Sequence, residues 1–182
     1  MNTEMTPRER SLTMAVIEIE QHSAAAGWDA PVSVFALIRT ADALADNPAL
    51  AQEFPPEVVE AARHDPEHLT SIEQDGLPES TNLEELLAQL AWPETVAGAA
   101  IVVERIVVPP EAEANMPQDP DAGVDYLMNH PDRQDVRIAA GRLRTGESWC
   151  ALRSRANDND DAVAGGPDAV PGLVEALAAT LR

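Results

Sequence analysis

Lysine is absent from this sequence, because all twelve of its basic residues are arginine. The absence excludes Schiff-base chemistry on a lysine and the lysine of a phosphate-binding loop. The chain also lacks a G-x-S-x-G motif and any glycine pattern of a dinucleotide-binding loop. Several large enzyme classes are therefore excluded, and we expect no cofactor.

Cysteine and long hydrophobic runs are scarce as well. The one cysteine, Cys150, cannot form an intrachain disulfide, which is typical of a reducing compartment. Residues 1–14 contain no apolar stretch of the kind that a signal peptide needs. The longest apolar run, residues 96–103, is too short to span a bilayer. We therefore expect a cytoplasmic protein without membrane contact.

Positive charge is in short supply. The 12 basic residues face 32 acidic ones, which gives a net charge of −20. A surface of this sign repels nucleic-acid phosphates and anionic membranes. Nucleic acid and membrane are therefore excluded as expected partners, and a protein partner or a second copy of the chain remains.

The length of 182 residues predicts a single domain, residues 1–182. A capping box at Thr6 and Glu9 predicts a first helix that ends at Gly27. Thr81 and Glu84 form a second capping box, and helices are expected at 40–46, 57–63 and 124–129 and at the C-terminus. Strands are expected at 32–39, 68–74, 96–108, 135–144 and 148–155. This order favours an α+β fold, a twisted antiparallel β-sheet flanked by helices.

Two segments stand apart from these elements. Residues near 109–123 and 156–167 are acidic, contain proline or glycine and show no periodicity, so we predict that they are flexible. By contrast, both alternating faces of 96–108 are apolar. This segment is therefore predicted to lie in the centre of the sheet with both faces covered.

The last two strands form a predicted hairpin whose register can be argued. A three-residue loop at 145–147 pairs Ala140 with Leu152 and places Ile138, Ala140 and Cys150 on the core face. Arg153 then stands on the solvent face, and Arg137 lies opposite Arg155. Cys150 in the core behaves as a small hydrophobic residue rather than as a nucleophile.

Two metal-site patterns are present but incomplete. His64 and His68 match the H-x-x-E-H pattern of zinc peptidases, yet Pro66 between them breaks the helix that this pattern requires. The acidic run 157–161 lacks the glycine and glutamate spacing of a calcium loop. We therefore predict no metal site.

The candidate site consists of charged residues near the predicted sheet. Glu104 and Arg105 interrupt an apolar strand, either where the strand leaves the core or at a buried ion pair or ligand contact. Arg137, Arg153 and Arg155 belong to an arginine cluster on the hairpin. This cluster either balances the acidic loops or binds an anion or a partner.

Several segments of the chain resemble an uncharacterised actinobacterial family. The resemblance covers nearly the whole chain and rests on Trp28-Asp29-Ala30-Pro31, Phe35-Ala36-Leu37, Ile72-Glu73-Gln74, Trp92-Pro93, Val102-Val103-Glu104-Arg105, His130-Pro131 and Gly146-Glu147-Ser148-Trp149-Cys150-Ala151-Leu152. It implies the α+β fold of the photosystem protein PsbP, and it carries no activity, cofactor or catalytic residue to these positions. Relatives of that fold mostly bind proteins.

These observations predict a non-enzymatic cytoplasmic binding or regulatory protein with a protein partner or a homodimer partner. The alternative is an enzyme or small-ligand binder that uses Glu104, Arg105 and the hairpin arginines. The two hypotheses differ in whether those charges converge on a concave site.

Overall fold

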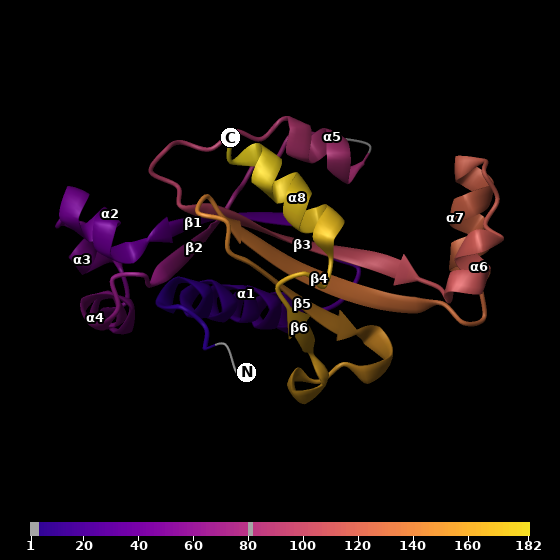
Figure 1. Ribbon diagram of the computed structural model, residues 1–182, viewed down its shortest axis with the longest axis horizontal. Helices are drawn as coiled ribbons and strands as arrows, with labels where there is room; N and C mark the ends of the chain where they lie inside the picture. Colours follow the sequence, from indigo (N-terminus) through magenta and orange to yellow (C-terminus); the bar gives the residue numbers. More distant parts are fainter. Residues whose placement is uncertain (1–3, 80–81) are drawn as a thin grey trace.

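The computed structural model describes residues 4–79 and 82–182. Its strands form one antiparallel six-stranded sheet in the order β2-β1-β3-β4-β5-β6, with helices on both sides (Figure 1). The predicted α+β fold with an antiparallel sheet is confirmed. The strands are β1 Ser33–Arg39, β2 Leu69–Glu73, β3 Gly98–Val107, β4 Gln134–Leu143, β5 Ser148–Ser154 and β6 Ala164–Gly166.

The longest helix, α1, begins and ends as the sequence predicts. Thr6 and Glu9 form the capping box, and Gly27 with φ 96° ends the helix. Thr81 of the second predicted box lies outside the described residues, and Asn82 caps α5 by accepting the Glu85 N–H at 2.8 Å. The helices are α1 Pro7–Ala26, α2 Thr40–Asp46, α3 Leu50–Glu53, α4 Pro56–His64, α5 Leu83–Ala88, α6 Pro110–Ala114, α7 Pro120–Asn129 and α8 Pro171–Thr180.

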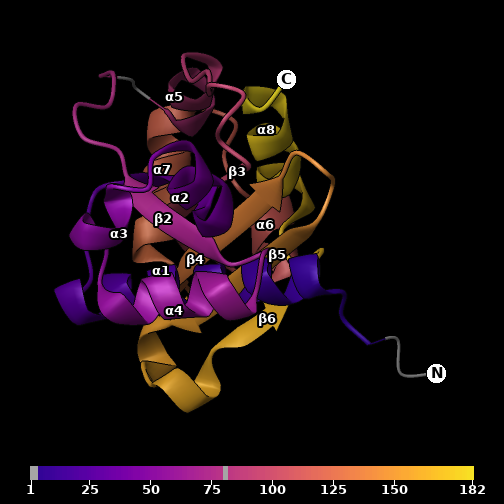
Figure 2. The same cartoon turned by 90° about the vertical axis from the view of Figure 1, so that its left-hand side faces the viewer.

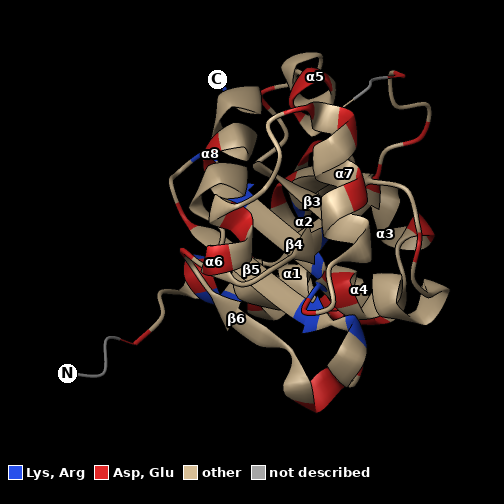
Figure 3. Cartoon of the chain, turned by 90° about the vertical axis from the view of Figure 1, so that its right-hand side faces the viewer, with Lys and Arg blue, Asp and Glu red and all other residues tan. Residues whose placement is uncertain are grey.

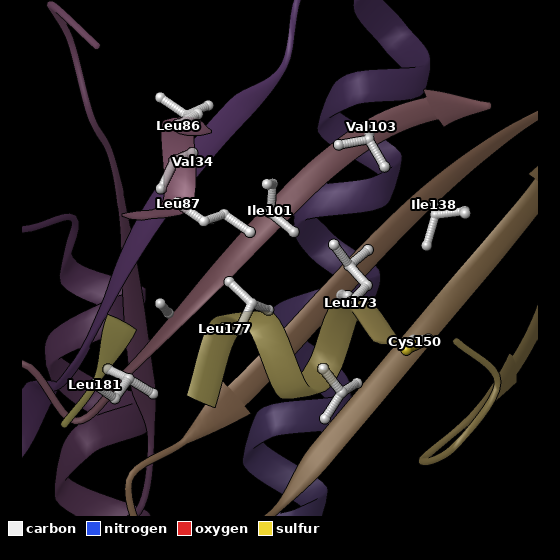
Figure 4. Close-up of a cluster of buried hydrophobic side chains, with 13 residues drawn as sticks. Val34, Leu86, Leu87, Ile101, Val103, Ile138, Cys150, Leu173, Leu177 and Leu181 are labelled. Atoms are coloured by element: carbon white, nitrogen blue, oxygen red, sulfur yellow. The ribbon is translucent and has the colours of Figure 1, made fainter. Parts of the chain in front are cut away.

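Both faces of the sheet are covered. In Figures 1 and 2, α1 lies against one face, whereas α5 and α8 lie against the other. The side chains of β3 alternate between the two layers: Ile101 and Val103 contact the α5–α8 layer (Figure 4), and Val102 contacts the α1 layer. The prediction that this strand is central and buried on both faces is confirmed. Within the described residues, no helix combines the length and the apolar character needed to cross a membrane.

The register of the β4–β5 hairpin differs from the prediction. Leu143 donates its N–H to the Glu147 carbonyl at 2.9 Å, so the three-residue loop is 144–146, with Gly146 at φ 110°. Ala140 therefore pairs with Cys150 rather than Leu152, and Arg137 pairs with Arg153 rather than Arg155. The slip is two residues in pairing and leaves each side chain on its predicted face, because side chains alternate with a period of two.

The predicted solvent face of the hairpin was wrong. Ala139 and Ala151, on the face opposite Cys150, pack with Leu12 and Val16 of α1. Arg153 shares that face and is only 2 % exposed. The hairpin pattern identified which residues share a face, but it did not reveal that α1 covers that face.

The two acidic segments contain more regular structure than expected. Segment 109–123 includes α6 and the start of α7, whose first residues are Pro110 and Pro120. Segment 156–167 includes the short helix η2 (Asp160–Ala162) and β6, which pairs with β5. These elements are too short to show periodicity in the sequence. The flexibility of both segments stays a prediction.

Candidate functional site

Most of the predicted charged residues lie around the turn that follows α1. Gly27 ends the helix, and Asp29 adopts the left-handed conformation with φ 64°. Through this turn Trp28 contacts Arg137 of β4 and Arg155, which directly follows β5. The guanidinium carbon of Arg137 lies 4.3 Å from the centroid of the Trp28 ring, and that of Arg155 lies 5.6 Å away. Both distances are within the range of a cation–π interaction.

Hydrogen bonds hold the backbone of this turn. Glu104 accepts the N–H groups of Asp29 and Ala30 at 2.8 and 2.7 Å. Arg155 binds both carboxylate oxygens of Asp29 at 3.0 and 3.2 Å and also contacts Asp135 at 3.4 Å. Glu104 and Arg155 thus stabilise the turn conformation.

Arg153 forms a buried ion pair beneath the turn. Its guanidinium contacts Glu20 of α1 at 2.5 and 3.1 Å, and Glu20 is only 1 % exposed. Asp158 and Asp160 add contacts at 3.0 and 2.5 Å. The hydrogen bonds that Arg153 donates to Glu20 and to the two aspartates raise its pKa. The indole N–H of Trp28 and then Arg153 lower the pKa of Asp158. A buried pair of this kind is costly to break from one side.

Arg137 has fewer hydrogen-bond partners than Arg153 or Arg155. It is 1 % exposed and donates through Nη2 to the Gly27 carbonyl, but its buried Nη1 has no hydrogen-bond partner among the described residues. A hollow of about 80 Å³ adjoins it and is also lined by Glu104 and His22. Sites for small organic ligands usually measure roughly 300–1,000 Å³. The hollow is therefore far too small for most substrates.

The structure gathers four of the five predicted site residues. Glu104, Arg137, Arg153 and Arg155 lie around the Trp28 turn, whereas Arg105 is exposed and makes no contact with the turn. Their roles as a ligand or partner site stay predictions.

Sequence reasoning missed the two residues that connect this cluster. Trp28 was not among the predicted site residues, although the large ring of a tryptophan packs against neighbouring side chains and cations. Glu20 occupies a helical position in phase with Val16 on the buried face of α1. A carboxylate in phase with an apolar stripe indicates a buried cationic partner, and this signal could have included Glu20 in the candidate site.

Groups that commonly carry out covalent chemistry lie elsewhere. Cys150 is fully buried on the α8 side of the sheet, and burial raises the pKa of its thiol. As Pro66 predicts, α4 ends at His64, which contacts Glu60 at 2.8 Å. His68 instead contacts the Thr40 hydroxyl at 2.8 Å. The two imidazoles therefore have different partners.

A groove of about 670 Å³ lies at the opposite end of the sheet. Ile38, Leu69 and Leu143 contribute apolar surface to it. Arginines and carboxylates also line it in nearly equal number, so the groove favours no ligand of one charge. These charged residues are Arg8, Arg39, Arg144, Asp42, Asp46, Glu67 and Glu94.

Residues 108–133, here called the arm, connect β3 to β4 and include α6 and α7. In Figure 1 the arm stands beyond the end of the sheet, away from the other helices. Tyr126 of α7 donates to the Ala112 carbonyl of α6 at 2.9 Å, and its ring meets His130 edge-on at 5.5 Å. The hydrogen bond joins α7 to α6, and the ring contact lies at the end of α7.

The arm also exposes large apolar side chains. Met116, Val124 and Met128 are 38 %, 59 % and 50 % exposed, and Val107 at the base of the arm is 47 % exposed. Val124 and Met128 lie one turn apart on α7, and neighbouring exposed apolar side chains are typical of an interaction site.

Comparisons with known proteins identify a family but no activity. No curated protein and no solved structure matches the chain, so the PsbP-like fold stays a prediction. Residues 12–182 match the PPA1309-like protein family. That family is named after a Propionibacterium protein, which agrees with the predicted actinobacterial resemblance. Since the match spans nearly the whole sequence, the chain belongs to the PPA1309-like protein family.

Proposed function

We propose that this is a non-enzymatic cytoplasmic binding protein that presents its arm to a partner protein. One observation carries the proposal: Met116, Val124 and Met128 are exposed on a segment that stands off from the body (Figure 1). Methionine side chains adapt their shape to a partner surface and are frequent where proteins bind other proteins.

The charged cluster supports the same proposal because its members already have partners within the chain. Glu104, Arg153 and Arg155 make hydrogen bonds within the chain that hold the Trp28 turn and the acidic segment after β5. Groups engaged in this way are not available to a substrate without breaking the turn. The alternative, an enzyme or ligand binder that uses these residues and Arg105, has less support because the adjoining hollow measures only about 80 Å³.

Paired substitutions on the arm test the proposal. Val124→Asp with Met128→Asp should reduce the amount of partner captured from a lysate of the producing organism by about tenfold or more, since buried apolar anchors dominate most interfaces. The melting temperature should stay close to that of the wild type, because both side chains are exposed. Quantitative mass spectrometry of proteins retained by each immobilised variant provides the measurement.

Met14→Asp is the matched control, because Met14 is 56 % exposed on α1, outside the arm. The control should retain the partner at the wild-type level. Equal capture by the arm variant and the wild type would contradict the proposal.

A further inference from the structure

The outer face of α7 combines acidic and apolar side chains in a regular pattern. Asp121, Val124, Asp125 and Met128 stand at i, i+3, i+4 and i+7, and all four are exposed. Residues at this spacing share one face of a helix. In Figure 3, acidic residues mark α6 and α7 on this side of the molecule. We call these four residues the α7 face.

The opposite side of α7 is already occupied. Gly123 is buried, and Tyr126 and Leu127 are half-buried. An ordinary surface helix directs its apolar residues inward and its charged residues outward. On α7, Val124 and Met128 instead lie on the outer side, one turn apart. Within the arm, Arg133 contacts Met128, with Nη1 3.7 Å from the sulfur, yet Met128 stays 50 % exposed and Val124 59 % exposed. Packing within the arm therefore leaves much of the apolar half of the α7 face uncovered.

The acidic half of the face also has no ionic partner in the part of the chain that the structure describes. Across residues 4–79 and 82–182, the carboxylates of Asp121 and Asp125 form no ion pair. The whole arm carries six carboxylates against one arginine, Arg133. A surface that fits this face must offer positive charge beside apolar side chains.

We infer that the α7 face docks a basic amphipathic helix of another protein, with two apolar residues one turn apart and lysine or arginine beside them. This inference rests on the proposed function and names the chemistry of its partner. A second copy of the chain fits poorly, because it would bring its own net charge of −20 and the same carboxylates to the contact.

Labelled heptad peptides provide the probes, with fluorescence anisotropy at about 0.15 M ionic strength as the measurement. The basic probe has leucines one turn apart and lysines beside them. In a second probe glutamate replaces lysine, and in a third probe serine replaces leucine. The intact wild-type chain should bind the leucine–lysine peptide saturably and should bind the other two about tenfold more weakly or not at all.

Substitutions then locate the binding site. Val124→Ser with Met128→Ser should weaken binding of the leucine–lysine peptide by about tenfold, and Asp121→Asn with Asp125→Asn by about fivefold. The matched control is Met14→Ser with Glu18→Gln, because Met14 and Glu18 are an exposed methionine and carboxylate one turn apart on α1. The control should leave binding unchanged.

Three outcomes would overturn the inference. Equal weakening by the control and arm variants would mean that the peptide responds to the net charge of the whole chain. A dimer in sedimentation that Val124→Ser with Met128→Ser abolishes would assign the face to a second copy. A partner captured through the arm that is not basic would refute this inference but leave the proposed function standing, whereas the absence of any arm-dependent partner would refute the proposed function itself.

Discussion

Arg153→Ala should lower the free energy of unfolding by about 3–5 kcal/mol. The substitution removes the guanidinium that binds Glu20 at 2.5 and 3.1 Å and leaves a carboxylate that is 1 % exposed without its counter-charge. It also releases Asp158 and Asp160 from the contacts that hold the segment after β5. Urea denaturation at neutral pH measures the change, which is a large part of the stability of an ordinary domain.

Two further variants distinguish the loss of the buried ion pair from the loss of an exposed charge. Arg155→Ala removes a guanidinium whose side chain is 43 % exposed, so it should lower stability far less than Arg153→Ala does. Glu20→Leu with Arg153→Met should recover most of the stability, because an apolar pair can replace a buried ion pair at little cost. A loss for Arg153→Ala no larger than that for Arg155→Ala would contradict the buried position of Arg153.

Val103→Asp should prevent the chain from folding. Val103 is 3 % exposed in the central strand and belongs to the core cluster that includes Ile138 and Leu173 (Figure 4). A carboxylate at this position must either stay charged in a region of low dielectric constant or take up a proton, and each costs several kcal/mol. Circular dichroism and thermal melting should show no cooperative transition.

Val107→Asp is the matched control for this prediction. Val107 has the same phase in β3 but is 47 % exposed, so the carboxylate stays hydrated and the loss should be below about 1 kcal/mol. Similar melting of the two variants would contradict the position of Val103 in the core.

The alternation of apolar residues predicted the centre of the fold well. Both faces of segment 96–108 are apolar, and β3 does lie in the middle of the sheet with a helical layer on each side. The face to which Ile138 and Cys150 belong was also predicted correctly. A period of two fixes the face of each side chain, whatever the pairing partner.

The same pattern could not place Arg153. Alternation assigns a residue to a face, but whether that face meets solvent depends on another element, here α1. Arg153 can lie on the covered face because Glu20 balances its charge there. The two residues are 133 positions apart in the sequence. The pairing slip has a local cause, since the three-residue loop begins one residue earlier than predicted and Gly146 rather than Glu147 ends it.

The sequence predicted most of the residues of the candidate site, but not how they are arranged. Glu104 was selected because charges are unusual in an apolar strand, and the hairpin arginines because they cluster in a very acidic chain. Four of the five predicted residues do converge. Their point of convergence, Trp28, depends on how the chain leaves α1. The sequence predicted only the second half of α7, at 124–129, because α6 and the first turn of α7 are short and begin at prolines within an acidic segment.

The most direct test of the account is to excise the arm. Val107 and Gln134 are already partners in the β3–β4 register, so Asn-Gly in place of residues 108–133 should close a hairpin between them. The account predicts a chain that unfolds cooperatively within about 1 kcal/mol of the wild type and no longer captures the partner. Full capture by the excised chain, or a chain that cannot fold without the arm, would contradict the claim that the arm is a binding element carried by an independent body.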